Sequence, residues 1–305
     1  MPGFLTHYLA GQNLLGRARD ETKQILNEHE KLFNLGCQGP DIFFYYFPGL
    51  MYKQTRGFGT VMHNSNLGLF ILDMANICKT NNARDVFAYT CGYIMHYALD
   101  STSHPYVFAR TTTEGASSIK NGADHRIFET AIDILMLKRL RGKNPNDFVH
   151  ADLIKAPKPS LRSSADAVSS AAAKVYSRTI SKGKTYSAMK FMILFTKLLQ
   201  SKKGRRKKVL NFFEKITIKE PLFSSMMHDQ DTNLDVLNLD KQSWQAPWEG
   251  AVPKNHSFIE MFDASVSEAV GICNVMYDFV YGESKESELH EILGNKSLKT
   301  GISIG

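Results

Sequence analysis

Histidine and acidic residues recur at four-residue intervals in two stretches of the chain. His96, Asp100 and His104 follow one another at this spacing, and His125 is followed four residues later by Glu129. Residues four apart lie on the same face of a helix, and zinc accepts imidazole nitrogens and carboxylate oxygens as ligands. With 10 histidines and 30 acidic residues, one such pair means little, but the triple is far rarer by chance. The pattern therefore predicts a metal site.

The spacing of the triple favours more than one metal ion. A helix rises about 1.5 Å per residue, so His96 and His104 are about 12 Å apart along a continuous helix. Zinc–nitrogen bonds are only about 2.0–2.1 Å long, so two ions with Asp100 between them are easier to accommodate than one. Pro105 disfavours helical backbone at the residue before it, which would let His104 turn elsewhere. The residues indicate a site for several metals without fixing its arrangement.

The elements that position these residues are predicted to be helices. The apolar pattern predicts helices over 4–15 (with His7), 20–36 (with Asp20 as N-cap), 61–78 (with His63), 86–103, 123–140, 164–180, 187–199 and 258–281. The helix over 86–103 is apolar almost all round, so it should be central and buried. Burying His96 and Asp100 there is costly unless they are paired or bind metal. No strand pair, internal repeat or glycine-rich phosphate loop is visible, so we expect an all-α fold.

Asp41 lies at the end of a glycine- and proline-rich stretch, directly before the apolar and aromatic run 42–47. An acid in this position could cap a helix. The alternative is a carboxylate held against an apolar wall, which suits a metal ligand or a general base. A similar choice applies to His63, which could be a core histidine, and to the aromatic run, which could be core or a wall for acyl chains or a base.

The composition is that of a soluble globular protein, with 43% hydrophobic and 22% charged residues in 305. The four cysteines have no paired spacing, which argues against a zinc–thiolate cluster and suits a reducing compartment. A net charge of +7 favours anionic partners such as phospholipid headgroups or nucleic acid. We see neither a signal peptide nor an apolar run of about 18 residues. We therefore expect a cytoplasmic protein, with peripheral membrane association as an option.

We expect one domain over 1–305, with the metal site in 1–140, a linker candidate at 143–163 and a tail at 283–305. Trp244 and Trp248 should pin the polar segment 229–256 to the surface. The apolar helix over 187–199 precedes a basic cluster that begins at Lys202 and ends at Lys208. This pairing resembles an interfacial element that binds anionic membranes. A core helix followed by a solvated basic turn is the alternative, and nucleic-acid binding is weakened because no aromatic residues interrupt the cluster.

Taken together, eight residues resemble the zinc-dependent phospholipase C family, whose all-helical fold is shared with the fungal zinc nucleases that cut single strands. They are His7, Asp41, His63, His96, Asp100, His104, His125 and Glu129. The resemblance covers roughly residues 1–140. The short spacing from Asp100 to His104 also resembles the glycosylphosphatidylinositol-specific phospholipase D branch.

The resemblance implies three metal positions. Asp41, His63, His96 and Asp100 would surround the first, and His104, His125 and Glu129 the second. Asp100 would bridge to a third position that includes His7. Secreted members also use the amine of a processed N-terminal tryptophan there, whereas this sequence begins Met1-Pro2-Gly3. We therefore expect two zinc ions and leave open whether a third ion occupies the remaining position.

The resemblance implies a hydrolase of lipid metabolism that cleaves a phosphodiester, with phospholipase C-type release of a phospholipid headgroup. Zinc lowers the pKa of bound water from about 15.7 toward 7, and by resemblance Asp41 would take the water's proton. The rival hypotheses are a single-strand nuclease, a non-catalytic member that keeps metal for stability, and a protein whose histidines are core residues without metal. The sequence identifies neither the headgroup nor the oligomeric state.

Overall fold

The computed structural model describes residues 3–46, 52–113, 118–176, 179–200, 207–209, 211, 214, 224–228, 235–248 and 253–304. Every regular element in these ranges is a helix, and the only β-type pairings there are two isolated bridges, Trp244 with Lys254 and Lys296 with Ser303. The all-α fold predicted from the sequence is confirmed.

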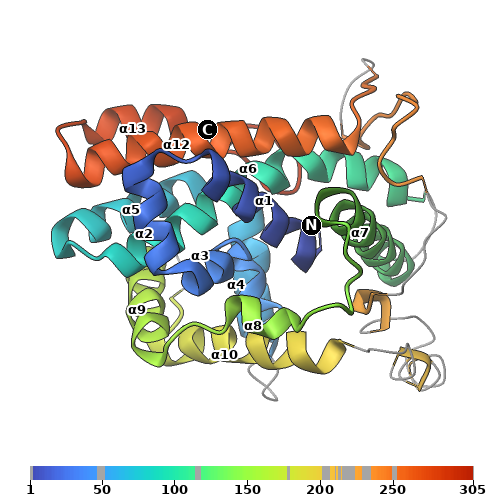
Figure 1. The fold of residues 1–305 in the computed structure, drawn as a ribbon, viewed down its shortest axis with the longest axis horizontal. Helices are drawn as coiled ribbons and strands as arrows, with labels where there is room; N and C mark the ends of the chain where they lie inside the picture. Colours follow the sequence, from blue (N-terminus) through green and yellow to red (C-terminus); the bar gives the residue numbers. More distant parts are fainter. Residues whose placement is uncertain are drawn as a thin grey trace.

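The helices pack around one long central helix (Figure 1). In chain order they are α1 (Phe4–Arg17), α2 (Asp20–Glu28), α3 (Glu30–Gly36), η1 (Gly39–Phe43), α4 (Tyr52–Asn64), α5 (Leu67–Asn81), α6 (Arg84–Thr111), α7 (Ser118–Arg141), α8 (His150–Ile154), α9 (Lys158–Val175), α10 (Lys182–Leu199), η3 (Ser224–Met226), α12 (Phe258–Tyr281) and α13 (Glu286–Leu293). The central helix is α6, which contacts α3, α5, α7, α9 and α12. Its predicted central position is confirmed.

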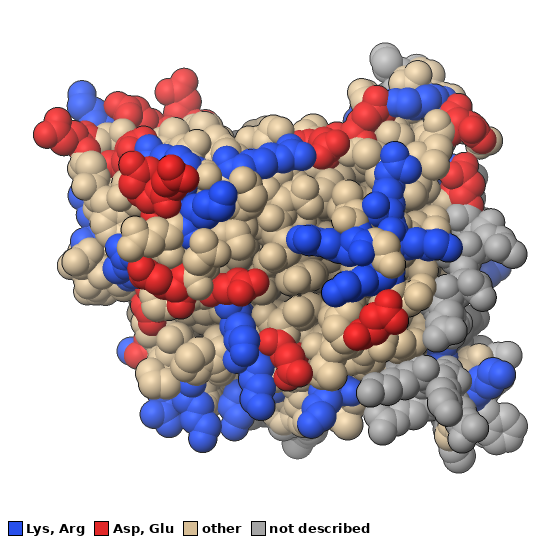
Figure 2. Space-filling model, in the orientation of Figure 1, with Lys and Arg blue, Asp and Glu red and all other residues tan. Residues whose placement is uncertain are grey.

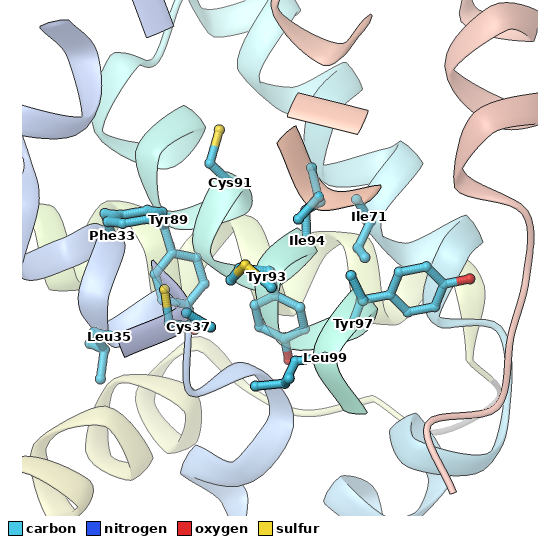
Figure 3. Packing of buried hydrophobic residues seen from close by; sticks show 14 of the residues in the cluster. Phe33, Leu35, Cys37, Ile71, Tyr89, Cys91, Tyr93, Ile94, Tyr97 and Leu99 are labelled. Carbon is cyan, nitrogen blue, oxygen red and sulfur yellow. The ribbon is translucent and has the colours of Figure 1, made fainter. Parts of the chain in front are cut away.

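Large apolar side chains of α6 form the middle of the core. Tyr89, Tyr93 and Tyr97 are completely buried, and Figure 3 shows them among side chains from α3 and α5, including Phe33 and Ile71. Burying a large apolar side chain contributes roughly 1.5–3 kcal/mol to stability. All four cysteines are buried as free thiols. Helix α6 is therefore held in place by completely buried side chains.

Helix α6 continues through Pro105 to Thr111, so the expectation that His104 leaves the helix is wrong. Proline lacks an N–H and so removes one hydrogen bond, here the bond to the carbonyl of Ser101. The turn that follows is packed, because Tyr106 and Val107 are completely buried. That tertiary packing outweighs the local preference of the residue before proline.

Two predicted helices are each divided in the structure. The helix expected over 61–78 is broken at Asn66, whose φ of 53° is left-handed, so His63 lies on α4 rather than α5. The helix expected over 20–36 is interrupted at His29. Asp20 lies in the first turn of α2, and Arg19 takes the N-cap position. Asparagine tolerates the left-handed region better than most residues, which permits the first break.

The expected linker and tail hold packed helices. The range 143–163 contains α8, which contacts α3 and α10, and the start of α9. The range 283–304 contains α13, and Leu289, Leu293 and Leu298 are buried in the same hydrophobic cluster as the rest of the core. Residues 202–206 of the basic cluster lie outside the described residues. Among the helices that the structure describes, none is long and apolar enough to cross a membrane.

Candidate metal centre

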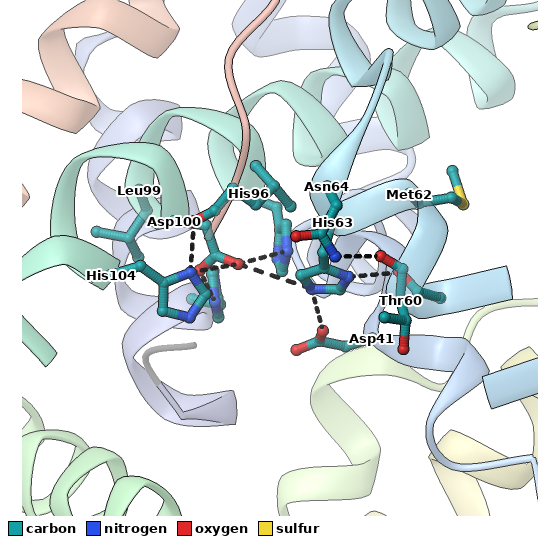
Figure 4. Close-up of polar contacts among 12 residues, drawn as sticks. Asp41, Thr60, Met62, His63, Asn64, His96, Leu99, Asp100 and His104 are labelled. Carbon is teal, nitrogen blue, oxygen red and sulfur yellow. Dashed lines mark hydrogen bonds and ion pairs between the residues drawn. The ribbon is translucent and has the colours of Figure 1, made fainter. Parts of the chain in front are cut away.

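Helix α6 places three polar side chains in the core. His96, Asp100 and His104 are 0%, 0% and 3% exposed and lie on successive turns. Asp100 lies at the centre, with its Oδ2 3.1 Å from Nε2 of His96 and its Oδ1 3.2 Å from Nε2 of His7. Figure 4 shows His63 of α4 beside the same carboxylate, at 3.9 Å from its Oδ2, and Asp41 of η1 on the other side of the His63 ring. Metal-competent atoms from three other elements, α1, η1 and α4, therefore lie around α6.

One group of candidate ligands consists of Asp41, His63 and His96. Oδ1 of Asp41 lies 3.2 Å from Nε2 of His63, and the N-cap position of η1 belongs to Gln38 rather than to Asp41. Gly39 permits this approach, because its φ is +49° and a Cβ there would lie 2.4 Å from the His96 ring. Glycine is the residue that tolerates such a backbone and such a contact. The turn that carries Asp41 can thus lie directly against α6.

A second group consists of His104, His125 and Glu129. Helix α7 supplies the latter two from adjacent turns, with Nε2 of His125 2.7 Å from Oε1 of Glu129. The same carboxylate oxygen lies 4.0 Å from Nε2 of His104. The side chain of His125 is 16% exposed, more than the other two, so this group lies nearer to the surface.

A third group consists of His7, His96 and Asp100. The His7 ring stacks on the His96 ring, with centroids 4.3 Å apart. Helix α1, which carries His7, is tied to α7 by Asp133. The two carboxylate oxygens of Asp133 accept the N–H groups of Leu5 and Thr6 at 3.0 and 2.8 Å. Asp133 follows Glu129 by four residues on α7, the same spacing as that from His125 to Glu129, but the sequence gave no sign of this anchoring role.

Three of the histidines direct Nδ1 to a backbone carbonyl. The distances are 2.7 Å for His63, 3.1 Å for His96 and 2.6 Å for His104, and the carbonyls are those of Gly59, Cys37 and Leu298. Donation of Nδ1–H to such an acceptor fixes the ring orientation and leaves Nε2 as the ligating nitrogen. The sequence carried no signal for these carbonyls, because any residue can supply one.

The pKa shifts of three histidines and of Asp100 suit metal binding, whereas the shift of His96 favours the protonated ring, whose proton a metal would displace. Burial lowers the pKa values of His7, His104 and His125, so these rings are neutral near pH 7. Burial opposes ionisation of Asp100, yet the neighbouring His96 holds its pKa well below the usual range. Burial also lowers the pKa of His96, but Asp100 and its other partners outweigh it and raise that pKa. Neutral histidine and ionised carboxylate are the forms that bind metals.

Several buried polar atoms of the centre make no hydrogen bond within the described part of the chain. They are both ring nitrogens of His7, Nε2 of His96, Oδ1 of Asp41 and both oxygens of Asp100. Some face each other at 3.1–3.2 Å, but their directions do not form a hydrogen bond. An unpaired buried polar group costs about 1–3 kcal/mol. A cation would satisfy these atoms, and a donor set of nitrogen and oxygen is one that zinc accepts. The residues therefore fit a metal.

The aromatic run after Asp41 divides between core and site. Phe43 packs edge-on against Phe58, and Tyr46 is also buried. Phe44 is half-buried, and its ring centroid lies 5.2 Å from that of His63. Phe47 lies outside the described residues. Among the described members of the run, Phe44 is the one whose ring packs on a candidate ligand, so it is placed to form an apolar wall beside the centre.

The structure brings together all eight side chains that the sequence singled out, and their role as ligands stays a prediction. A family model described as zinc dependent phospholipase C matches residues 3–190, which include all eight. Neither the comparison with curated proteins nor the comparison with solved structures finds a match. The matched region ends before α12, α13 and the segment around Leu298.

Proposed function

Since the chain belongs to the zinc-dependent phospholipase C family, we propose that its buried centre binds zinc and hydrolyses a phosphodiester. The substrate class is a phospholipid, cleaved on the phospholipase C side of the phosphate so that a phosphorylated headgroup leaves. The observation that carries this proposal is the set of unpaired, buried nitrogen and oxygen atoms around Asp100. Such atoms are costly in a folded protein unless a cation binds them.

We assign the reaction's proton transfer to Asp41. When bound, zinc lowers the pKa of a water ligand toward 7 and stabilises negative charge on phosphate oxygens. One oxygen of Asp41 lies 3.2 Å from Nε2 of His63, which orients the carboxylate and leaves its other oxygen to accept a proton. At 6% exposure Asp41 is buried, but less completely than His96 and Asp100, which are 0% exposed. The half-buried Phe44 beside His63 would exclude water from the apolar part of the lipid.

A nuclease is the second candidate, because a basic surface also suits a polyanion. Lys and Arg side chains gather on the right half of the face shown in Figure 2, close to α7 in Figure 1. The last turn of α7 contributes exposed Lys138, Arg139 and Arg141. The same charges would also attract an anionic lipid surface, so the surface alone does not decide between the two substrates.

The deciding experiment compares two substrates with one zinc-loaded preparation. Phosphatidylcholine vesicles and single-stranded DNA are each incubated with the protein, with and without a chelator. We expect chelator-sensitive release of phosphocholine and no cleavage of the DNA. Cleavage of the DNA alone would replace the lipase proposal by the nuclease. A protein that binds zinc but cleaves neither substrate would be a metal-stabilised, non-catalytic member of the family.

A further inference from the structure

The residues after α13 fold back on themselves to form what we call the C-terminal clip, residues 295–304. Within the clip, the N–H of Ser297 donates to the carbonyl of Ile302 and the N–H of Gly301 to the carbonyl of Ser297, both at 2.9 Å. Lys296 and Ser303 form a bridge across it. The clip is therefore a closed turn with its own hydrogen bonds.

The clip is anchored to the central helix α6 and to α12, which packs on α6. The Tyr97 hydroxyl on α6 accepts the N–H of Lys296 at 2.8 Å and donates to the carbonyl of Leu293 at 3.0 Å. The Lys296 ammonium lies 2.6 Å from the Glu268 carboxylate on α12. Leu298 is completely buried. The residues just before Leu298 are thus held by α6 on one side and by α12 on the other.

Leu298 joins two of the candidate ligand groups through its backbone. Its N–H donates to the carbonyl of His63 at 2.9 Å, and its carbonyl accepts from Nδ1 of His104 at 2.6 Å. The first bond holds the residue that faces Asp41, and the second sets the ring of the residue that faces Glu129. The backbone of Leu298 therefore links His63 of one group to His104 of the other.

We propose that the C-terminal clip is a positioning element of the metal centre. It sets the spacing between His63 and His104 and makes Nε2 of His104 the ligating nitrogen, because Nδ1–H is committed to Leu298. The clip lies outside the matched range 3–190, so the centre depends on a part of the chain that the family match does not include. This inference rests on the proposed zinc binding.

Gly301 is the position at which the clip can be displaced without touching a candidate ligand. Its φ is +68°, and a Cβ there would lie 2.3 Å from the carbonyl oxygen of Ser101, whose usual helical donor is missing because residue 105 is proline. Gly301→Ala should push the clip away from α6 one turn before His104. Gly142→Ala is the matched control, because Gly142 has a φ of +61° and its added Cβ would meet no described atom within 4 Å.

The test measures zinc affinity by competition with a chromophoric chelator at 25 °C, with helix content followed by circular dichroism. We expect Gly301→Ala to bind zinc about 10–100-fold more weakly than the wild type, the loss typical when an outer partner of a metal ligand is changed. Gly142→Ala should bind zinc as the wild type does. The zinc affinity is measured on folded protein. If the clip only supports stability, Gly301→Ala should therefore bind zinc as tightly as the wild type.

A milder pair of variants covers the case in which Gly301→Ala does not fold. Tyr97→Phe removes only the hydroxyl that holds the clip. Tyr93→Phe removes a neighbouring hydroxyl that, among the described residues, donates only to the Met62 sulfur, at 3.9 Å. We expect weaker zinc binding in Tyr97→Phe alone. Affinities within about twofold of the wild type in every folded clip variant would overturn the inference. A wild type without zinc would overturn it together with the proposed function, whereas zinc binding without hydrolysis would overturn the function alone.

Discussion

At the scale of single residues, Asp41 separates a working enzyme from a folded metal binder. We expect Asp41→Asn to fold and to keep zinc at the group of His104, yet to lose at least about 10²-fold in phosphodiester hydrolysis, because the amide cannot take a proton. The rate is measured as phosphocholine release. Asp73→Asn is the control, since that buried acid pairs with Lys174 away from the centre. Full activity in Asp41→Asn would remove this residue from the mechanism.

A second residue-scale prediction concerns His150, which is not among the candidate ligands. Burial lowers its pKa to about 4, from about 6.5 in an unfolded chain. The unfolded state then binds more protons between pH 4 and 6.5, so this contribution to stability is complete above pH 6.5 and is lost as the pH falls toward 4.

Replacing His150 by glutamine should therefore reduce the acid sensitivity of folding. Between pH 7 and pH 5 we expect the zinc-free wild type to lose about 2 kcal/mol more of its unfolding free energy than His150→Gln does. Urea unfolding of both proteins in the presence of chelator measures the difference. Parallel losses in the two proteins would show that His150 does not titrate in this window.

At the scale of elements, the position of α1 depends on Asp133. An asparagine there keeps one acceptor oxygen, whereas the carboxylate now accepts from Leu5, Thr6 and His228 with both. We expect Asp133→Asn to lower the free energy of unfolding by about 1–3 kcal/mol, the cost of buried donors left unpaired. Chemical denaturation measures the loss. Asp166→Asn, an exposed partner of Lys182, should stay within about 0.5 kcal/mol of the wild type.

Some of the helices and contacts of this fold could be predicted from the sequence, and others could not. The bounds predicted for the last long helix, 258–281, agree with α12, because its apolar stripe is regular and Ser257 with Glu260 forms a capping box. The continuation of α6 through Pro105 was not predictable from local preference, since buried neighbours decide it. The grouping of the eight side chains followed from residue type and spacing. Their carbonyl partners, such as that of Cys37, are backbone groups that leave no mark in the sequence.

At the scale of the whole molecule, the number of metal ions is the main expectation. We expect at least two zinc ions per chain, because the three groups offer more nitrogen and oxygen ligands than one tetrahedral ion can use. Elemental analysis after reconstitution at neutral pH gives the number, and less than one equivalent would contradict the proposal. His96→Ala and Asp100→Ala should each lower the zinc content and the Tm, while exposed His290→Ala should change neither.

The charge of the whole molecule suggests a lipid surface as a partner. The net charge is +7, and we propose that the basic cluster 202–208, most of which lies outside the described residues, binds anionic vesicles. Each charge near such a surface contributes about 1 kcal/mol. Reversing the charges of Lys207 and Lys208 should weaken sedimentation with phosphatidylserine vesicles, most clearly at low salt. Unchanged sedimentation would identify this end of the cluster as a solvated turn.

The contact between Leu298 and the two ligand groups has a consequence for the synthesis of the protein on the ribosome. Translation proceeds from the N-terminus, so all eight candidate ligands leave the ribosome before the clip does. At about 5–20 residues per second, the delay between Glu129 and Leu298 is on the order of ten seconds. During that interval a nascent chain would display its histidines without the residue that orients His104. Tight zinc binding should therefore require the complete chain. A ribosome-stalled chain that ends before residue 295 should bind zinc only weakly.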